Sequence, residues 1–148
     1  MYEHLLVPVD GSALSDKAIE HSIGLAKMLG ASITGFTAEP PLPVLVVEQA
    51  AVAYDVETFQ AHEKRCEAHA REVLLAFAEK ARQAGVAFDG QFVISDNVQQ
   101  AIADMAEQRH CDLIVMASHG RHGLDALIHG SLTKSVLAHS QVPLLVLH

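Results

Sequence analysis

The sequence alternates short apolar runs with longer segments of helical periodicity, and this alternation is the feature that most constrains its fold. The first of these runs, residues 4–9, has β-branched members and lacks polar alternation, which is typical of a parallel strand buried on both faces. We predict strands over residues 4–9, 32–38, 87–94, 113–117 and 143–147. The pattern therefore predicts an α/β fold: one doubly wound five-stranded parallel sheet with right-handed crossovers and helices on both faces.

The segments between these runs favour helices, because their apolar residues recur at three- and four-residue steps. We predict helices over residues 15–29, 56–84, 98–109 and 131–139. Gly30 and Gly85 suit the left-handed position that commonly ends a helix, and Asp96 or Asn97 can cap the third helix.

One stretch resists assignment. Pro40, Pro41 and Pro43 cannot continue a strand inside a sheet, because proline has no N–H group for the ladder, so a loop begins there. Residues 44–54 that follow are apolar without a clean period. A lid, a contact with a partner and the first turns of the next helix all remain open for them.

Composition narrows the functional classes. A chain of 148 residues that is 50% hydrophobic forms one domain, residues 1–148. Its net charge of -8 repels nucleic acid and anionic membrane surfaces, so we expect no partner of either kind. No apolar stretch approaches the roughly 20 residues of a membrane-spanning helix. With two cysteines and no signal-like N-terminus, we expect a reduced, cytoplasmic protein.

Two motifs that carry chemistry follow predicted strands. Asp10-Gly11-Ser12 comes after the first strand, and Ala117-Ser118-His119-Gly120, nine residues and Gly130-Ser131 come after the fourth. Ligands of doubly wound sheets bind beyond the carboxyl ends of the strands, where the strand order reverses, so both motifs should face one crevice.

The second motif suits a phosphate group. We expect Ser131 in the first turn of the last helix, where free N–H groups beside Gly130 and the helix dipole favour an anion. Arg121, and secondarily His122, can offset phosphate charge. Seen singly, such fragments are usually turn devices or helix caps. Together, a carboxylate and a phosphate cradle predict a nucleotide ligand.

These residues resemble the universal stress protein family, whose nucleotide-binding branch carries Gly-x2-Gly-x9-Gly-[Ser/Thr]. The resemblance spans the chain, including residues 7–12, 112–116 and 142–146. It implies strand order 3-2-1-4-5 and a regulatory protein that binds ATP or AMP, with Mg2+ associated with the nucleotide. The nucleotide-binding residues that it implies are Pro8, Val9, Asp10, Ser12, Thr37, Ala38, Met116, Ala117, Ser118, His119, Gly120, Arg121, Gly130, Ser131, Leu132 and Thr133.

Two departures from the family pattern bear on the site. Ala117 replaces the first glycine of the motif, and Ser95-Asp96-Asn97 stands where many members have a Gly-x-Pro turn. The added methyl group of Ala117 can be accommodated if that residue keeps a negative φ.

The resemblance also implies a homodimer. Residues 142–147 should form a sheet edge that is too apolar to face water, and two copies would pair antiparallel through it. The downstream protein partner is not identified by the sequence.

No separate metal or catalytic site is predicted. His62, Cys66 and His69 share one helix face, but one side of a helix offers too few ligands for zinc. Neither a Gly-x-Ser-x-Gly elbow nor a Walker motif occurs, so no catalytic residue is assigned. Two alternatives to the regulatory role stay open: a weak ATPase or autophosphorylating enzyme, and a nucleotide-free dimeric scaffold.

Overall fold

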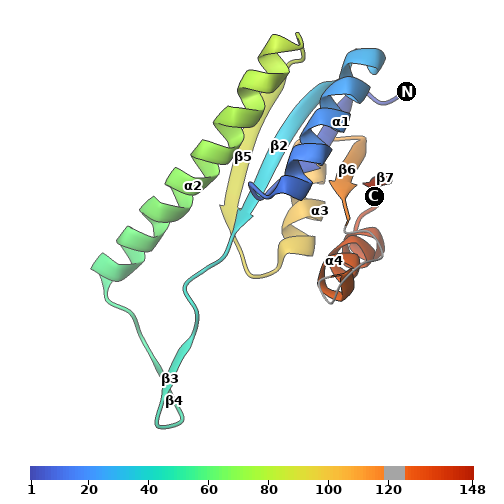
Figure 1. The fold of residues 1–148 in the computed structure, drawn as a ribbon. Coiled ribbons are helices and arrows are strands. Elements are labelled where there is room, and N and C mark those ends of the chain that lie inside the picture. The colour runs from blue at the N-terminus through green and yellow to red at the C-terminus, as the bar shows by residue number, and fades with distance from the viewer. Residues whose placement is uncertain (119–125) are drawn as a thin grey trace.

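The computed structural model describes residues 1–118 and 126–148, with the backbone alone for residues 126–131. Figure 1 shows the arrangement of the elements. In chain order they are β1 (His4–Pro8), α1 (Ala13–Leu29), β2 (Ser32–Glu39), β3 (Leu45–Val47), β4 (Ala50–Val52), α2 (Val56–Gln83), β5 (Phe88–Ile94), α3 (Val98–Gln108), β6 (Leu113–Ala117), α4 (Ala126–His139) and β7 (Leu144–Leu147).

Five of the strands form a parallel sheet in the order β5-β2-β1-β6-β7. The central strand β1 pairs on one side with β2, where Leu5 lies opposite Ile33, and on the other with β6, where Leu5 lies opposite Leu113. With β3 and β4 left out of the numbering, this is the predicted order 3-2-1-4-5. The predicted α/β fold is confirmed.

Side chains that alternate along the strands divide the core into two layers. Leu5 and Val7 of β1 pack with Phe77 of α2 and with α1 on one face of the sheet. Leu6 packs with Ile102 of α3 and with α4 on the other face. Helices therefore cover both faces, as predicted (Figure 1). None of the helices in the described part of the chain is long and apolar enough to cross a membrane.

The first three helices begin and end close to their predicted bounds. Ser12 caps α1 by accepting a hydrogen bond from the Ser15 N–H group, and Gly30 ends this helix in the left-handed region with φ 68°. Asp55 caps α2, and Asn97 caps α3. Asn97, rather than Asp96, is therefore the cap of the third helix.

The unassigned residues 44–54 form an antiparallel hairpin of β3 and β4. The interpretation as first turns of the next helix is wrong, because α2 begins at Val56. The two residues of the turn, Glu48 and Gln49, have φ values of 50° and 64°, which match the twist of a tight hairpin. The hairpin extends away from the sheet and its helices (Figure 1).

The start of the last helix also differs from the prediction. Helix α4 begins at Ala126, so Gly130 and Ser131 lie in its second turn and Ser131 is not in the first turn. The residues just upstream include the strong helix formers Ala126 and Leu127. A single glycine inside a helix costs only about 1 kcal/mol relative to alanine, so Gly130 does not stop the helix from extending upstream.

Candidate functional site

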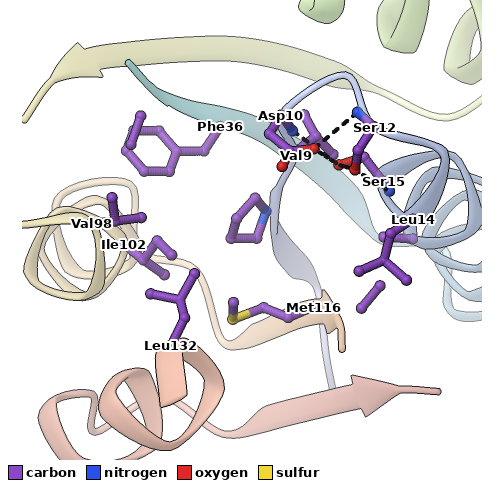
Figure 2. Close-up of a pocket in the computed structure, with 14 residues that line it drawn as sticks. Val9, Asp10, Ser12, Leu14, Ser15, Phe36, Val98, Ile102, Met116 and Leu132 are labelled. Carbon is purple, nitrogen blue, oxygen red and sulfur yellow. Dashed lines mark hydrogen bonds between the residues drawn. The ribbon is translucent and has the colours of Figure 1, made fainter. Parts of the chain in front are cut away.

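A cavity of about 240 Å³ opens at the carboxyl end of β1, between the ends of β2 and β6. Figure 2 shows the side chains around it. This is where the strand order reverses, the expected place for a ligand in such a sheet. The lining residues are Pro8, Val9, Asp10, Ser12, Leu14, Ser15, Ala18, Phe36, Ala38, Val98, Ile102, Met116, Ala117 and Leu132.

The inner wall of the cavity is apolar. Phe36 and Ala38 lie two residues apart on β2, so both point to the face that α3 and α4 cover. Val98 and Ile102 of α3, together with Leu132 of α4 and Met116 of β6, complete this wall (Figure 2). Such a wall can bury a flat apolar group, while orientation must come from polar groups at the rim.

The polar groups of the rim come from the turn between β1 and α1 and from the first turn of α1. The Ser15 hydroxyl donates to Asp10 Oδ1 at 2.6 Å, and the Ser12 N–H group donates to the same oxygen at 2.9 Å. The Asp10 N–H group in turn donates to Ser15 Oγ at 2.9 Å. Figure 2 shows this network beside the cavity. The Asp10 carboxylate is therefore held in place by its own loop, which lowers the entropy cost of binding a ligand there.

Gly11 allows this turn to lie against α2. Its φ of 83° is in the left-handed region, and a Cβ atom built there would lie 3.0 Å from Val73 Cγ2. A side chain at this position would be strained and crowded at the same time. The rim therefore depends on a glycine between its two polar residues.

Ala117 ends β6 and lines the cavity. The described non-glycine residues with positive φ are Glu48, Gln49 and His110, so Ala117 keeps a negative φ. The condition for accommodating its methyl group is thus met. The methyl group narrows the cavity without distorting the strand.

Comparison with known proteins decides the family. The profile of the universal stress protein family matches residues 1–148. The chain belongs to the universal stress protein family. One curated relative, universal stress protein A homolog 1 of Coxiella burnetii, is 30% identical over 141 residues, covering 92% of this chain and 89% of that protein.

Solved structures of universal stress proteins share the fold. One, a universal stress protein in complex with cAMP, has a TM-score of 0.71 at 20% identity and covers 99% of this chain and 97% of its own. Another, from Arabidopsis thaliana with AMP bound, has a TM-score of 0.63 at 15% identity and covers 98% and 90%. At these identities, the likeness establishes the fold alone.

The cavity of this universal stress protein contains half of the residues that the sequence predicts for nucleotide binding. They are Pro8, Val9, Asp10, Ser12, Ala38, Met116, Ala117 and Leu132. His119, Gly120 and Arg121 lie outside the described residues, and of Gly130 and Ser131 only the backbone in α4 is described.

The three remaining predicted residues do not line the cavity. Thr37 lies between Phe36 and Ala38 and so points to the opposite face of the sheet, where its buried hydroxyl has no hydrogen-bond partner among the described residues. Ser118 is buried, and its Oγ lies 3.0 Å from His148 Nδ1. Thr133 is half-buried in α4.

Sequence reasoning missed six lining residues, namely Leu14, Ser15, Ala18, Phe36, Val98 and Ile102. Five of them are apolar and carry no chemical pattern. The strand period could have found Phe36, because it shares a face with Ala38. Ser15 could have been found from its distance to Ser12, since a capping residue meets the third residue after it.

Side chains of two histidines and a cysteine on α2 contact the end of β2 and the residue that follows it. His62 Nε2 lies 2.8 Å from the Pro40 carbonyl oxygen and 3.3 Å from Cys66 Sγ, while His69 Nδ1 lies 2.6 Å from Glu39 Oε1. Burial, with a smaller contribution from Glu39, raises the pKa of the Cys66 thiol. Among the described residues, no group of three or more His, Cys, Asp or Glu side chains could hold a metal ion.

Proposed function

We propose that this protein binds an adenine nucleotide, ATP or AMP, in the cavity beside Asp10 and acts as a regulator in the cytoplasm. The observation that carries the proposal is an apolar cavity at the switch point of the sheet with one carboxylate held at its rim. The base would insert against Phe36, Ile102 and Met116, and the ribose hydroxyls would donate to Asp10. The cAMP and AMP complexes of other family members support this choice of ligand.

The size of the cavity suits the nucleoside part of the ligand. At about 240 Å³ it lies below the usual range of roughly 300–1,000 Å³ for ligand pockets. The phosphates would therefore extend out of the cavity, past Leu132 towards α4. Asp10 is the one carboxylate among the described lining residues, so Mg2+ would arrive with the phosphates of ATP.

The conformational response would lie in α4. Backbone N–H groups beyond the first turn of a helix belong to its hydrogen-bond ladder and cannot bind phosphate. Gly130 and Ser131 occupy that position in the present α4. Phosphate binding through them requires the first turn of α4 to unwind, which would place free N–H groups next to Ser131. A nucleotide-dependent start of α4 is a change that a partner protein could recognise.

We also propose that two copies pair through β7, as the resemblance implies. This strand is the edge of the sheet next to β6, and Leu145 on it is 38% exposed. Its unpaired backbone groups and apolar side chains would be covered by the same strand of a second copy.

The direct test is to denature freshly purified protein and identify any released nucleotide by chromatography at 260 nm. The chain has no tryptophan and two tyrosines, so a bound nucleotide stands out in the absorbance. We expect ATP or AMP, and a nucleotide-free sample should gain about 2.7 kcal/mol of stability at 100 times the Kd. A protein that is empty and gains no stability from either nucleotide would contradict the proposal and favour the scaffold alternative.

A further inference from the structure

Residues 44–54, which we call the arm, expose an unusual amount of apolar surface. Every residue of β3 and β4 is exposed. Val44, Val46 and Val47 are 79%, 64% and 59% exposed. An isolated two-stranded hairpin is at best marginally stable in water, and contiguous exposed apolar side chains mark interaction surfaces. The arm therefore needs a surface that covers it.

The arm is held in a fixed direction. The Tyr54 hydroxyl donates to the Pro43 carbonyl oxygen at 2.6 Å, which closes the base of the arm. The Tyr54 ring lies edge-on to Phe59 of α2 at 5.7 Å, and His62 of α2 lies 2.8 Å from the Pro40 carbonyl oxygen. These contacts fix the base of the arm before any partner binds, which lowers the entropy cost of orienting the arm on association. They also direct it away from the body of its own chain (Figure 1).

The same chain has an apolar groove that is also uncovered. It lies between α2 and the edge strand β5, has a volume of about 340 Å³, and includes Leu74, Leu75, Phe88 and Phe92. Leu75 is 62% exposed and Phe92 is 38% exposed. We call it the α2–β5 groove.

The charges around this groove are already neutralised. Arg71 pairs with Glu67 at 2.9 Å, and Asp89 pairs with Arg109. The arm itself carries one charged residue, Glu48. An arm in the groove would therefore bury little unpaired charge, and burying unpaired charge is a large cost of association. It would also limit the repulsion between two chains that each have a net charge of -8.

We propose that the arm of each copy lies in the α2–β5 groove of a second copy. Each chain supplies one arm and one groove, so a two-fold exchange covers both arms and both grooves of the pair. The groove also offers the exposed edge of β5, along which a strand of the arm can add hydrogen bonds. This contact uses residues distinct from β7 and from the cavity beside Asp10, so it does not rest on the proposed nucleotide function.

Disulfide trapping between two differently tagged chains tests the contact. One chain carries Val46→Cys on the arm, and the other carries Leu75→Cys in the groove. On mild oxidation we expect the mixed disulfide as the main product. The matched control replaces the second chain with Leu137→Cys, since Leu137 on α4 is 64% exposed and lies in neither surface. A mixed yield no higher than in this control, or a larger yield of arm-to-arm disulfide, would overturn the proposal.

Sedimentation equilibrium provides the second measurement. Val46→Glu and Leu75→Glu should each raise the concentration at which the arm-to-groove complex dissociates by at least about tenfold. Leu137→Glu should leave that concentration unchanged. All three side chains are exposed, so circular dichroism should show folded protein in each case. Equal masses for wild type and both variants at every concentration would overturn the proposal. So would co-sedimentation of wild type, but not Val46→Glu, with phosphatidylcholine–phosphatidylglycerol vesicles, because the arm would then bind a membrane.

Discussion

Two neighbouring strands end at the same edge of the sheet and continue in opposite ways. After β1, the rim turn folds back onto α1 and joins Asp10, Ser12 and Ser15 in one hydrogen-bond network. After β2, the arm leaves the body with its valines exposed. The rim is closed by polar contacts within the chain and leaves a small cavity for a ligand. The arm instead leaves apolar side chains exposed, so the two segments at this edge of the sheet offer different kinds of surface.

The largest effect on folding is expected at Gly11 in the rim. Gly11→Ala places a side chain at φ 83° and 3.0 Å from Val73 Cγ2, so we expect a loss of about 2 kcal/mol in the free energy of unfolding. Gly24→Ala in α1 is the matched control. A Cβ atom there meets nothing within 4 Å, and a better helix former should add up to about 1 kcal/mol.

Urea unfolding of both alanine variants measures the difference. A loss of stability in Gly11→Ala together with a gain in Gly24→Ala would show that the backbone conformation of Gly11 is required by the rim. If Gly11→Ala unfolded at the same urea concentration as wild type, the rim would be as adaptable as an ordinary loop. That result would contradict the claim that the rim holds the Asp10 carboxylate in place.

A smaller effect is expected for Ser15, whose hydroxyl holds Asp10. Ser15→Ala removes a buried partner of both the Asp10 carboxylate and the Asp10 N–H group, which should cost about 1–2 kcal/mol. Thr37→Val also removes a buried hydroxyl, but this hydroxyl has no partner among the described residues. That variant should be neutral or slightly stabilising. Thermal unfolding of the two variants side by side checks the ranking, and an equal loss in both would contradict it.

The smallest perturbation concerns the base of the arm. Cys66 lies beside His62 and the Pro40 carbonyl oxygen, in the segment that leads into the arm, whereas Cys111 lies in the core against β1 and β6. Burial raises the pKa of Cys111 from 9.0 to about 11. Because the folded pKa is the higher one, the stabilisation from its neutral thiol is present below about pH 9 and is lost as the pH rises towards 11. Both thiols should therefore react slowly in the native protein at neutral pH.

His62→Ala should open the arm base and speed the labelling of Cys66 several-fold while leaving Cys111 unchanged. Timed labelling with N-ethylmaleimide, read by peptide mass spectrometry, measures both thiols in the same molecule. An equal increase in the labelling rates of Cys66 and Cys111 would indicate that the whole protein is loosened. It would contradict a local role for the His62 contact.

Strands β1 and β6 were predictable because burial on both faces leaves continuous apolar runs, and the first three helices were predictable because burial on one face leaves a helical period. The arm obeys neither rule. All residues of β3 and β4 are exposed, so no alternation between buried and exposed positions marks them as strands. The start of α4 was predicted wrongly for a different reason. Gly130-Ser131 has the composition of a helix start, yet the helix continues upstream to Ala126.

The polar half of the site was equally accessible from sequence. Asp10 and Ser12 follow a buried strand, and that placement alone locates them at the ligand-binding edge. Phe36, Val98 and Ile102 could not be distinguished from ordinary core residues, because an apolar cavity wall and a packed core use the same side chains. The structure brings them to the cavity through the crossing of α3 over the end of β2.

The measurement that tests the central claim most directly is calorimetric titration of nucleotide-free protein with AMP and with ATP. Wild type should bind one nucleotide per chain. Ala38→Leu should reduce the affinity at least about 100-fold, equivalent to about 2.7 kcal/mol, because the larger side chain fills the cavity where the base would insert. Ala68→Leu on the exposed face of α2 is the matched control and should bind like wild type. Equal affinity in all three proteins would place the nucleotide elsewhere, and no binding in any of them would contradict the account.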